Sequence, residues 1–239
     1  MQFAELHKPD TRGQIIADQI NRNGYAVIHD FVNPADLATA QDFIRAAVKA
    51  NGGEYTGFKG TDQLQDIFLG HLPEDPGFVS LCRSIYESGT GTPAPDEGFY
   101  QILRCLSGAG AKNHSMRFHF DSYVLTALIP VIVPDHGNPG RLIIHPNTRD
   151  IRKTYMRNLV DKTLSDNALS QRLLGLAYRL GTRRMLRLAL QPGSIYFFWG
   201  YRSLHTNEPC DADAIRATAL FHYVDPHSDS QMKQKLRRG

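Results

Sequence analysis

From residue 99 onward, the chain contains short segments of β-branched and aromatic residues that Gly, Pro and Asn turns separate, and this pattern constrains the fold most. Segments of this length and composition are typical of strands in an antiparallel sandwich or barrel. The expected strands are residues 99–106, 115–123, 124–134, 141–146, 195–201 and 215–225. The sequence therefore predicts a mainly β core with helices packed on it, which is an α+β protein.

Helical patterns precede this core and interrupt it once. Asn33 is a suitable N-cap with Pro34 at the first helical position, and apolar residues then recur at helical spacing through Lys49. We expect one domain over residues 1–239. Its parts are a helical and mixed flank at 1–98, a core at 99–225 with a helical insertion at 151–190, and a basic tail at 226–239. Within the flank we expect helices at 14–22, 34–49 and 77–88 and a strand at 24–32.

Composition excludes several classes of protein. With 41% hydrophobic and 21% charged residues, the chain can bury a sizeable core and is not mostly disordered. A net charge of +3 gives no argument for nucleic acid. The most apolar stretch, residues 123–133, is about half a bilayer crossing, so no transmembrane segment is expected. Three cysteines without a CxxC pair, and no visible signal peptide, indicate a reduced, cytoplasmic protein.

The candidate chemistry centres on the sequence His119-Phe120-Asp121 in an expected strand. Residues i and i+2 of a strand share a face, so the imidazole and the carboxylate can converge on one ion. A third ligand, His205, follows a later strand and a turn. Two histidines and one carboxylate with open positions opposite them are the donor set of non-haem Fe(II) oxygenases.

A second motif lies eleven residues beyond His205, where Arg216 and Thr218 share one face of an expected strand. A guanidinium beside a hydroxyl suits the far end of a dicarboxylate, because its fork binds a carboxylate through two hydrogen bonds. The order of HxD, distal His and then Arg resembles that of the Fe(II)/2-oxoglutarate-dependent dioxygenases.

The resemblance extends to the phytanoyl-CoA-hydroxylase-like branch of that family and covers about residues 24–50 and 99–225. The sequence GYAVIHDFVNPADLATAQDFI is similar to the branch's opening strand and helix. HGNPGRLIIHPNTR and QPGSIYFFWGYRSLHTNEP are similar to its central turn and strand and to the strand that delivers the distal histidine. The chain departs from the branch in having Pro-Asn-Thr-Arg where PGSH is usual, and Ser194 where Asp is usual.

The resemblance implies a double-stranded β-helix (a cupin-like jelly roll) that binds Fe(II) through His119, Asp121 and His205. It further implies that Arg216, assisted by Thr218, binds the C5 carboxylate of the cosubstrate 2-oxoglutarate, and that Gln101 contacts this cosubstrate. With O₂ as the second cosubstrate, 2-oxoglutarate would be decarboxylated to succinate. A small or carrier-borne organic substrate would be hydroxylated by hydrogen abstraction and rebound.

Two other functions use the same residues. One is a cupin-like jelly roll that binds a metal or ligand without oxygenase activity, and the other is a zinc hydrolase with the same three ligands plus water. Neither needs the dicarboxylate clamp of Arg216 and Thr218. Two further residues carry two interpretations each. His222 either lines the pocket or is a satisfied core histidine, and Arg117 either faces the site or forms an ion pair at the rim.

The segment 151–190 concentrates positive charge, with nine basic and two acidic residues, so it carries +7 and the rest of the chain −4. A cationic, Leu-rich helical lid would attract an anionic substrate, such as a CoA thioester, a carrier-bound acid or a phosphorylated or carboxylated lipid or sugar. Neutralising Arg183, Arg184 and Arg187 would then weaken substrate binding. The same pattern also suits contact with an anionic membrane surface. The alternative interpretation is a solvated or docked helical face.

Overall fold

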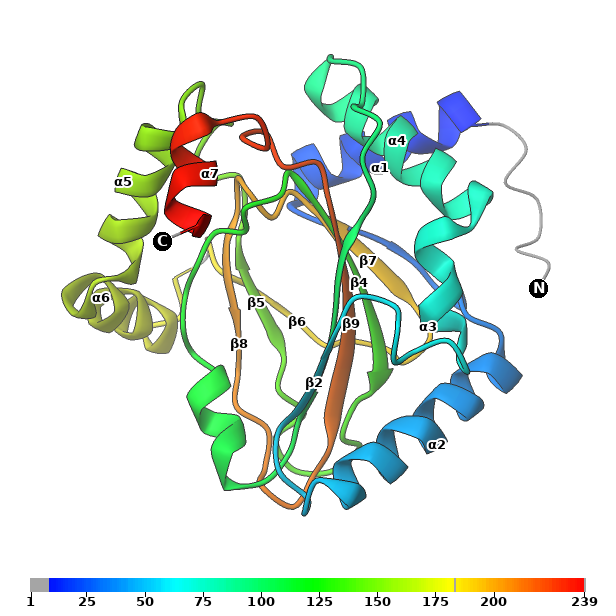
Figure 1. Ribbon diagram of the computed structural model, residues 1–239. Coiled ribbons are helices and arrows are strands. Elements are labelled where there is room, and N and C mark those ends of the chain that lie inside the picture. The colour runs from blue at the N-terminus through cyan, green and yellow to red at the C-terminus, as the bar shows by residue number, and fades with distance from the viewer. Residues whose placement is uncertain (1–8, 183, 239) are drawn as a thin grey trace.

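The computed structural model describes residues 9–182 and 184–238, in which two antiparallel β-sheets face each other (Figure 1). The larger sheet has the strand order β1-β7-β4-β9-β3-β2, and the smaller has the order β6-β5-β8. The strands are β1 (Ala26–Ile28), β2 (Thr56–Lys59), β3 (Tyr100–Leu106), β4 (Leu125–Ile132), β5 (Leu142–His145), β6 (Leu186–Leu188), β7 (Ile195–Phe198), β8 (Leu204–Asn207) and β9 (Arg216–Tyr223).

The topology is that of a jelly roll, and the predicted fold class is confirmed. Neighbouring strands in the larger sheet are distant in the chain, because β9 lies between β4 and β3 and pairs with both along almost its whole length. Four of the predicted strands, at 99–106, 124–134, 141–146 and 215–225, are present nearly as expected.

Four helices cover the outer face of the larger sheet: α1 (Pro9–Asn23), α2 (Pro34–Ala50), α3 (Phe68–His71) and α4 (Pro76–Thr90) (Figure 1). On β3, Leu103 and Cys105 belong to the core that these helices form with the sheet. Since side chains alternate along a strand, Tyr100, Ile102 and Arg104 face the space between the two sheets. The larger sheet therefore separates an apolar helical layer from an interior cavity.

The predicted helix boundaries have the expected physical causes. The Asn33 side chain accepts a hydrogen bond from the Asp36 amide, and Pro34 occupies the first turn of α2. Helix α1 ends at Gly24, which has φ +88°.

Two secondary-structure predictions are wrong. Residues 115–123 form no regular strand, because Met116 has φ +56° and pairing is limited to an isolated bridge between His119 and His205. The segment 24–32 contributes only the three residues of β1. His205 follows β7 and a turn, as expected, and lies within β8.

The insertion 151–190 is helical over α5 (Tyr155–Asp166) and α6 (Ala168–Arg179), but it ends in a strand. β6 pairs with β5, so that Leu186 and Leu188 lie opposite Ile144 and Leu142. Their helical spacing is accidental, and only the cross-strand partner decides their conformation. The basic tail contains α7 (Gln231–Arg238). Within residues 9–182 and 184–238, no helix combines the length and the apolar character that crossing a membrane would require.

Helix α5 is attached to the core through one buried guanidinium, that of Arg149, which is 7% exposed. Its nitrogens donate to the Tyr201 carbonyl, to Asn158 and to Asp161, at 2.7, 3.0 and 3.1 Å. The same guanidinium stacks over the Phe120 ring at 3.9 Å. This residue therefore connects α5 to the segment that carries His119 and Asp121.

Replacing Arg149 with Met should reduce the free energy of unfolding by about 3 kcal/mol, because Asn158 and Asp161 lose the buried guanidinium that binds them. Urea unfolding, followed by far-ultraviolet circular dichroism, measures this change. Arg152→Met is the matched control: Arg152 binds the same Asp161 carboxylate but is 37% exposed, so its loss should cost less than about 1 kcal/mol. Equal destabilisation by the two variants would contradict the anchoring role.

Candidate metal and cosubstrate site

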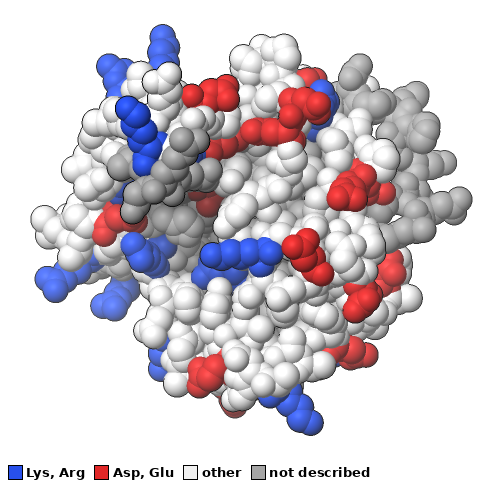
Figure 2. All heavy atoms as spheres, viewed as in Figure 1, with Lys and Arg blue, Asp and Glu red and all other residues white. Residues whose placement is uncertain are grey.

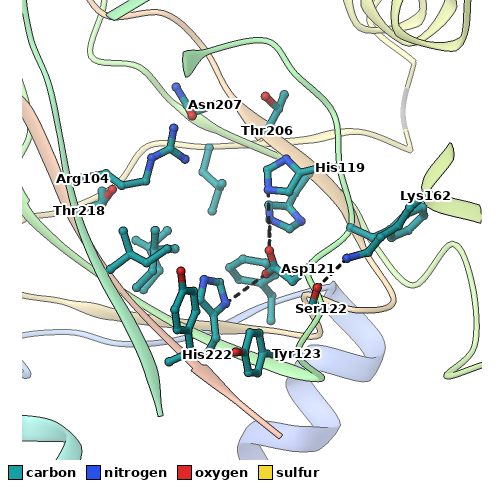
Figure 3. Close-up of a pocket in the computed structure, with 18 of the residues that line it drawn as sticks. Arg104, His119, Asp121, Ser122, Tyr123, Lys162, Thr206, Asn207, Thr218 and His222 are labelled. Carbon is teal, nitrogen blue, oxygen red and sulfur yellow. Dashed lines mark hydrogen bonds and ion pairs between the residues drawn. The ribbon is translucent and has the colours of Figure 1, made fainter. Parts of the chain in front are cut away.

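Three candidate ligands come together because the segment before β4 lies along the free edge of β8. The amide of His119 donates to the carbonyl of His205, and the amide of His205 donates to the carbonyl of His119, both at 3.0 Å. The Asp121 amide donates to the carbonyl of Gly200, also at 3.0 Å. The backbone thus holds all three residues side by side, and Figure 3 shows His119 and Asp121 pointing into the same space.

The ligand atoms of His119, Asp121 and His205 lie within 4.8 Å of one another. The Nε2 atoms of His119 and His205 are 3.7 and 3.4 Å from Asp121 Oδ1, and the two imidazole centroids are 4.4 Å apart. Two nitrogens and one carboxylate oxygen therefore point at one common position.

Both histidines have a fixed orientation that suits metal binding. His119 Nδ1 donates to the Arg117 carbonyl, and His205 Nδ1 donates to the Ser203 carbonyl, each at 3.0 Å. A proton held on Nδ1 leaves the lone pair on Nε2, which is the atom that faces Asp121. The backbone carbonyls therefore select the tautomer that can ligate.

The carboxylate of Asp121 is held from behind by two buried groups. Thr126 donates its hydroxyl to Oδ2 at 2.6 Å, and His222 Nδ1 lies 3.6 Å from the same oxygen. Oδ1 is therefore the oxygen turned towards the histidines. His222 lines the cavity, which is the first of its two sequence interpretations.

Burial and mutual charge shift the pKa values of the triad in different directions. Burial and the neighbouring His205 lower the pKa of His119 to about 4. Burial raises the pKa of Asp121, but His205 and His222 outweigh it and bring that pKa well below the usual range. Burial lowers the pKa of His205, but Asp121 outweighs it and leaves that pKa raised. At neutral pH the site presents an ionised carboxylate and a neutral His119.

This donor set fits a first-row divalent metal such as Fe(II). Imidazole nitrogens and a carboxylate bind iron, and a facial arrangement of three leaves positions open for other ligands. No thiolate competes, because Cys82, Cys105 and Cys210 are buried elsewhere in the fold. Zn²⁺ accepts the same donors, so the metal site alone does not decide the chemistry.

The triad opens into a cavity of about 300 Å³ between the two sheets. Arg216 and Thr218 of β9 also line it, so all five predicted site residues meet in one space. Figure 3 shows Thr218 beside Arg104 on one side of the cavity and His119 on the other. The apolar lining consists of Ile102, Leu128, Leu142, Phe198 and Leu220.

Arg216 is a buried cation, 3% exposed, with no acidic partner in the described part of the chain. Its Nε donates to the Gly140 carbonyl at 2.7 Å, which leaves the terminal nitrogens for a ligand. Burial, together with the neighbouring Arg104, lowers its pKa to about 10, so the group stays charged at neutral pH. Because an uncompensated buried charge is costly, this arrangement fits a bound carboxylate.

Gly140 is required beside Arg216 for two reasons. It has φ +68°, a conformation that favours glycine, and a Cβ there would clash with the Arg216 side chain.

Two sequence expectations near the site, for Gln101 and for Arg117, can be compared with the structure. The expected contact of Gln101 is wrong, because its side chain lies on the helical face of β3 and donates to the Leu69 carbonyl. Arg117 is exposed and lines a neighbouring depression of about 410 Å³, together with Arg104 and Lys162. The positive φ of Met116 interrupts the strand alternation on which the Arg117 hypothesis depended.

Sequence reasoning did not single out Lys162, which reaches the cavity from α5. Its Nζ donates to Ser122 Oγ at 2.7 Å, beside Asp121 (Figure 3). Burial lowers the pKa of Lys162, and Asp121 opposes that shift. In the sequence this residue is one of nine basic residues in the insertion, and nothing local distinguishes it from the others.

Gly200→Ala should weaken metal binding at least tenfold, about 1.4 kcal/mol, because a Cβ at this position would clash with the Asp121 carboxylate and with Thr126. Anaerobic titration with Co(II), followed by calorimetry, measures the dissociation constant. Gly175→Ala is the control, since a Cβ there meets nothing within 4 Å. An unchanged dissociation constant in Gly200→Ala would show that the carboxylate position does not govern metal affinity.

Comparison with known proteins gives a likeness in structure alone. The chain matches no family model and no curated protein sequence. A Trichoplax adhaerens prolyl hydroxylase, in complex with a hypoxia-inducible factor peptide fragment, superposes with a TM-score of 0.59 at 13% identity, covering 95% of this chain and 96% of that chain. A Pseudomonas putida prolyl-4-hydroxylase gives 0.51 at 14% identity, covering 88% and 93%.

A third similar structure has a different activity. SnoN, a non-haem α-ketoglutarate-dependent epimerase of nogalamycin biosynthesis, gives a TM-score of 0.55 at 16% identity, covering 90% of this chain and 81% of its own. SnoN has also been solved with Fe³⁺ and α-ketoglutarate bound. At these identities the likeness establishes a shared fold: this chain has the jelly-roll fold of the two prolyl hydroxylases and of the epimerase.

Proposed function

We propose that this protein is an Fe(II)- and 2-oxoglutarate-dependent oxygenase that hydroxylates a small or carrier-borne organic substrate, with residues 1–239 forming one catalytic domain. One observation carries the proposal. The triad of His119, Asp121 and His205 shares a cavity with Arg216, a buried cation that has no carboxylate partner among residues 9–182 and 184–238. A metal alone would explain the triad, and a dicarboxylate cosubstrate explains both features.

Each residue has a specific task in this proposal. His119, Asp121 and His205 hold the metal, while Thr126 and His222 keep the Asp121 carboxylate in place. Bound iron would couple the oxidative decarboxylation of 2-oxoglutarate to the activation of O₂ and the oxidation of a substrate carbon. Arg216, with Thr218, binds the C5 carboxylate, and the apolar lining excludes water from the cosubstrate.

Arg216 and Thr218 also weigh against the two alternatives. A cupin-like binding module without oxygenase activity, or a zinc hydrolase, has no need of a buried dicarboxylate clamp. The finer assignment to the phytanoyl-CoA-hydroxylase-like branch rests on the order of the sequence motifs, because the similar structures include prolyl hydroxylases and an epimerase.

An anionic substrate is supported by the charges around the cavity. Arg104, Arg117 and Lys162 line the depression beside the metal site, where Asp166 is the acidic residue. The insertion contributes Lys162 to this group. The sequence also predicts that Arg183, Arg184 and Arg187 attract the substrate. Arg187 forms an ion pair with Glu208, and Arg184 lines none of the cavities near the site. Arg183 lies outside the described residues.

The proposal predicts a characteristic spectrum and product. Anaerobic addition of Fe(II) and 2-oxoglutarate should give a visible charge-transfer band, and admission of air should yield succinate. His119→Ala, Asp121→Ala and His205→Ala should each abolish both signals, with little change in far-ultraviolet circular dichroism, because each change removes a metal ligand. A colourless complex that forms no succinate would reject the oxygenase function and leave the zinc or binding alternatives.

Arg216→Lys should raise the KM for 2-oxoglutarate at least tenfold, about 1.4 kcal/mol, because lysine keeps the charge but loses the two-pronged hydrogen bond. Steady-state succinate formation measures it, and the affinity for Co(II) should change little. Arg141→Lys is the matched control, since Arg141 is exposed and lies outside the cavity. If Arg104→Lys raised the KM and Arg216→Lys did not, the clamp would be Arg104.

A further inference from the structure

Helices α5 and α6 carry large apolar side chains on their solvent side. Seven of the ten large hydrophobic residues that are exposed in the described part of the chain lie on this hairpin, each at least 48% exposed. We call them the apolar stripe: Met156, Val160, Leu164, Leu169, Leu173, Leu176 and Leu180. Clusters of this kind on a protein surface mark interaction sites.

The apolar stripe is one-sided on each helix. Its members recur every three or four residues, a spacing that places them on one face of a helix. The faces turned towards the core carry polar groups, and on α6 they also include Leu174 and Tyr178. On α5, Asn158 and Asp161 bond to Arg149, and on α6 the Gln171 amide donates to the Phe118 carbonyl at 2.7 Å. This orientation is the reverse of that of a helix in a water-soluble domain, which buries its apolar face.

Positive charge surrounds the apolar stripe. Lys153, Arg157, Arg172, Arg179 and Arg184 are exposed and form no ion pair within the described residues, whereas Asp166 is the exposed acidic residue of α5. Figure 2 shows Lys and Arg gathered on the side where these helices lie. Pairing with a second copy would bring two cationic surfaces together, which charge repulsion opposes. An anionic lipid surface complements both the charge and the apolar stripe.

The apolar stripe continues into the interior. Leu164 and Leu173 also line a groove of about 490 Å³ that extends under the hairpin to Phe120. Phe120 lies between the candidate ligands His119 and Asp121 and lines their cavity as well. A molecule in the groove therefore contacts the same aromatic side chain that borders the metal cavity.

We propose that the α5–α6 hairpin docks on an anionic lipid surface and that the groove receives the apolar chain of an amphiphilic substrate. The docking stands independently, while the substrate class rests on the oxygenase function proposed above. In this arrangement the apolar stripe enters the lipid, the flanking Lys and Arg side chains contact the anionic head groups, and Lys162 lies where the polar end of the substrate would pass.

Vesicle flotation tests the docking. The protein should bind vesicles of phosphatidylcholine with phosphatidylglycerol at least tenfold more tightly than vesicles of phosphatidylcholine alone, and salt should weaken the binding. A triple variant, Leu169→Ser with Leu176→Ser and Leu180→Ser, should lose at least tenfold in affinity. None of the three residues lines the groove or the cavity. Ile15→Ser is the control, because Ile15 is 50% exposed on α1 and should leave binding unchanged.

Three results would overturn the docking. They are failure of the wild-type protein to bind the anionic vesicles, equal binding by the triple variant, and equal binding to neutral vesicles. Sedimentation equilibrium identifies the competing occupant: a dimer that the triple variant abolishes, in a protein that ignores vesicles, would assign the apolar stripe to self-association. Circular dichroism and thermal unfolding of the triple variant check that its fold is intact.

A second measurement separates the substrate class from the oxygenase function. Calorimetric titration of the triple variant with dodecyl phosphate and butyl phosphate should show at least tenfold tighter binding of the longer chain. Leu174→Gln, in the groove, should remove the difference. Equal affinities of the triple variant for the two phosphates would contradict an amphiphilic substrate. Succinate formation without added substrate should be the same in the triple variant and the wild type. If neither protein forms succinate, the oxygenase function is rejected and the docking is not.

Discussion

The site depends on one pair of backbone hydrogen bonds, which His119 and His205 exchange across the free edge of β8. Residues 115–121 form no regular strand of their own, so this bridge is what holds the first two candidate ligands beside the third. Once it forms, both Nε2 atoms face the same position, because each Nδ1 is bound to a carbonyl two residues away. The geometry of the candidate metal ligands is therefore a property of the backbone.

The cavity contains two buried charged groups, Asp121 and Arg216, whose surroundings differ. Asp121 is surrounded by Thr126 and three histidines, and this environment keeps its carboxylate ionised. Arg216 donates from Nε to the Gly140 carbonyl and has no counter-ion in the part of the chain that the structure describes. Since the free energy cost of such a cation falls when a carboxylate binds, the folded protein is prepared for an anionic ligand at this end. The apolar lining between the two ends strengthens both electrostatic interactions by excluding water.

The insertion shows what a local sequence pattern can predict and what it cannot. Its helical spacing predicted α5 and α6, and their apolar residues would ordinarily be assigned to a core. In the structure polar groups bind the hairpin to the core, through Arg149, Lys162 and Gln171, and the apolar stripe remains outside. A helical pattern states which residues share a face, but the hydrogen-bond partners elsewhere in the fold decide which face turns inward. The same limit explains the wrong helical assignment of Leu186 and Leu188, whose conformation depends on pairing with β5.

The sequence by itself determined the β core, the principal helices of the flank and five candidate site residues that prove to share one cavity, because alternation and residue chemistry are local properties. Tertiary structure alone decided which face of β3 meets the cavity, so that Arg104 lines the cavity and Gln101 does not. It also selected Lys162 from nine basic residues and required Gly200 beside the Asp121 carboxylate. These facts depend on close approach between segments that are distant in the chain, and no periodicity within a segment encodes such an approach.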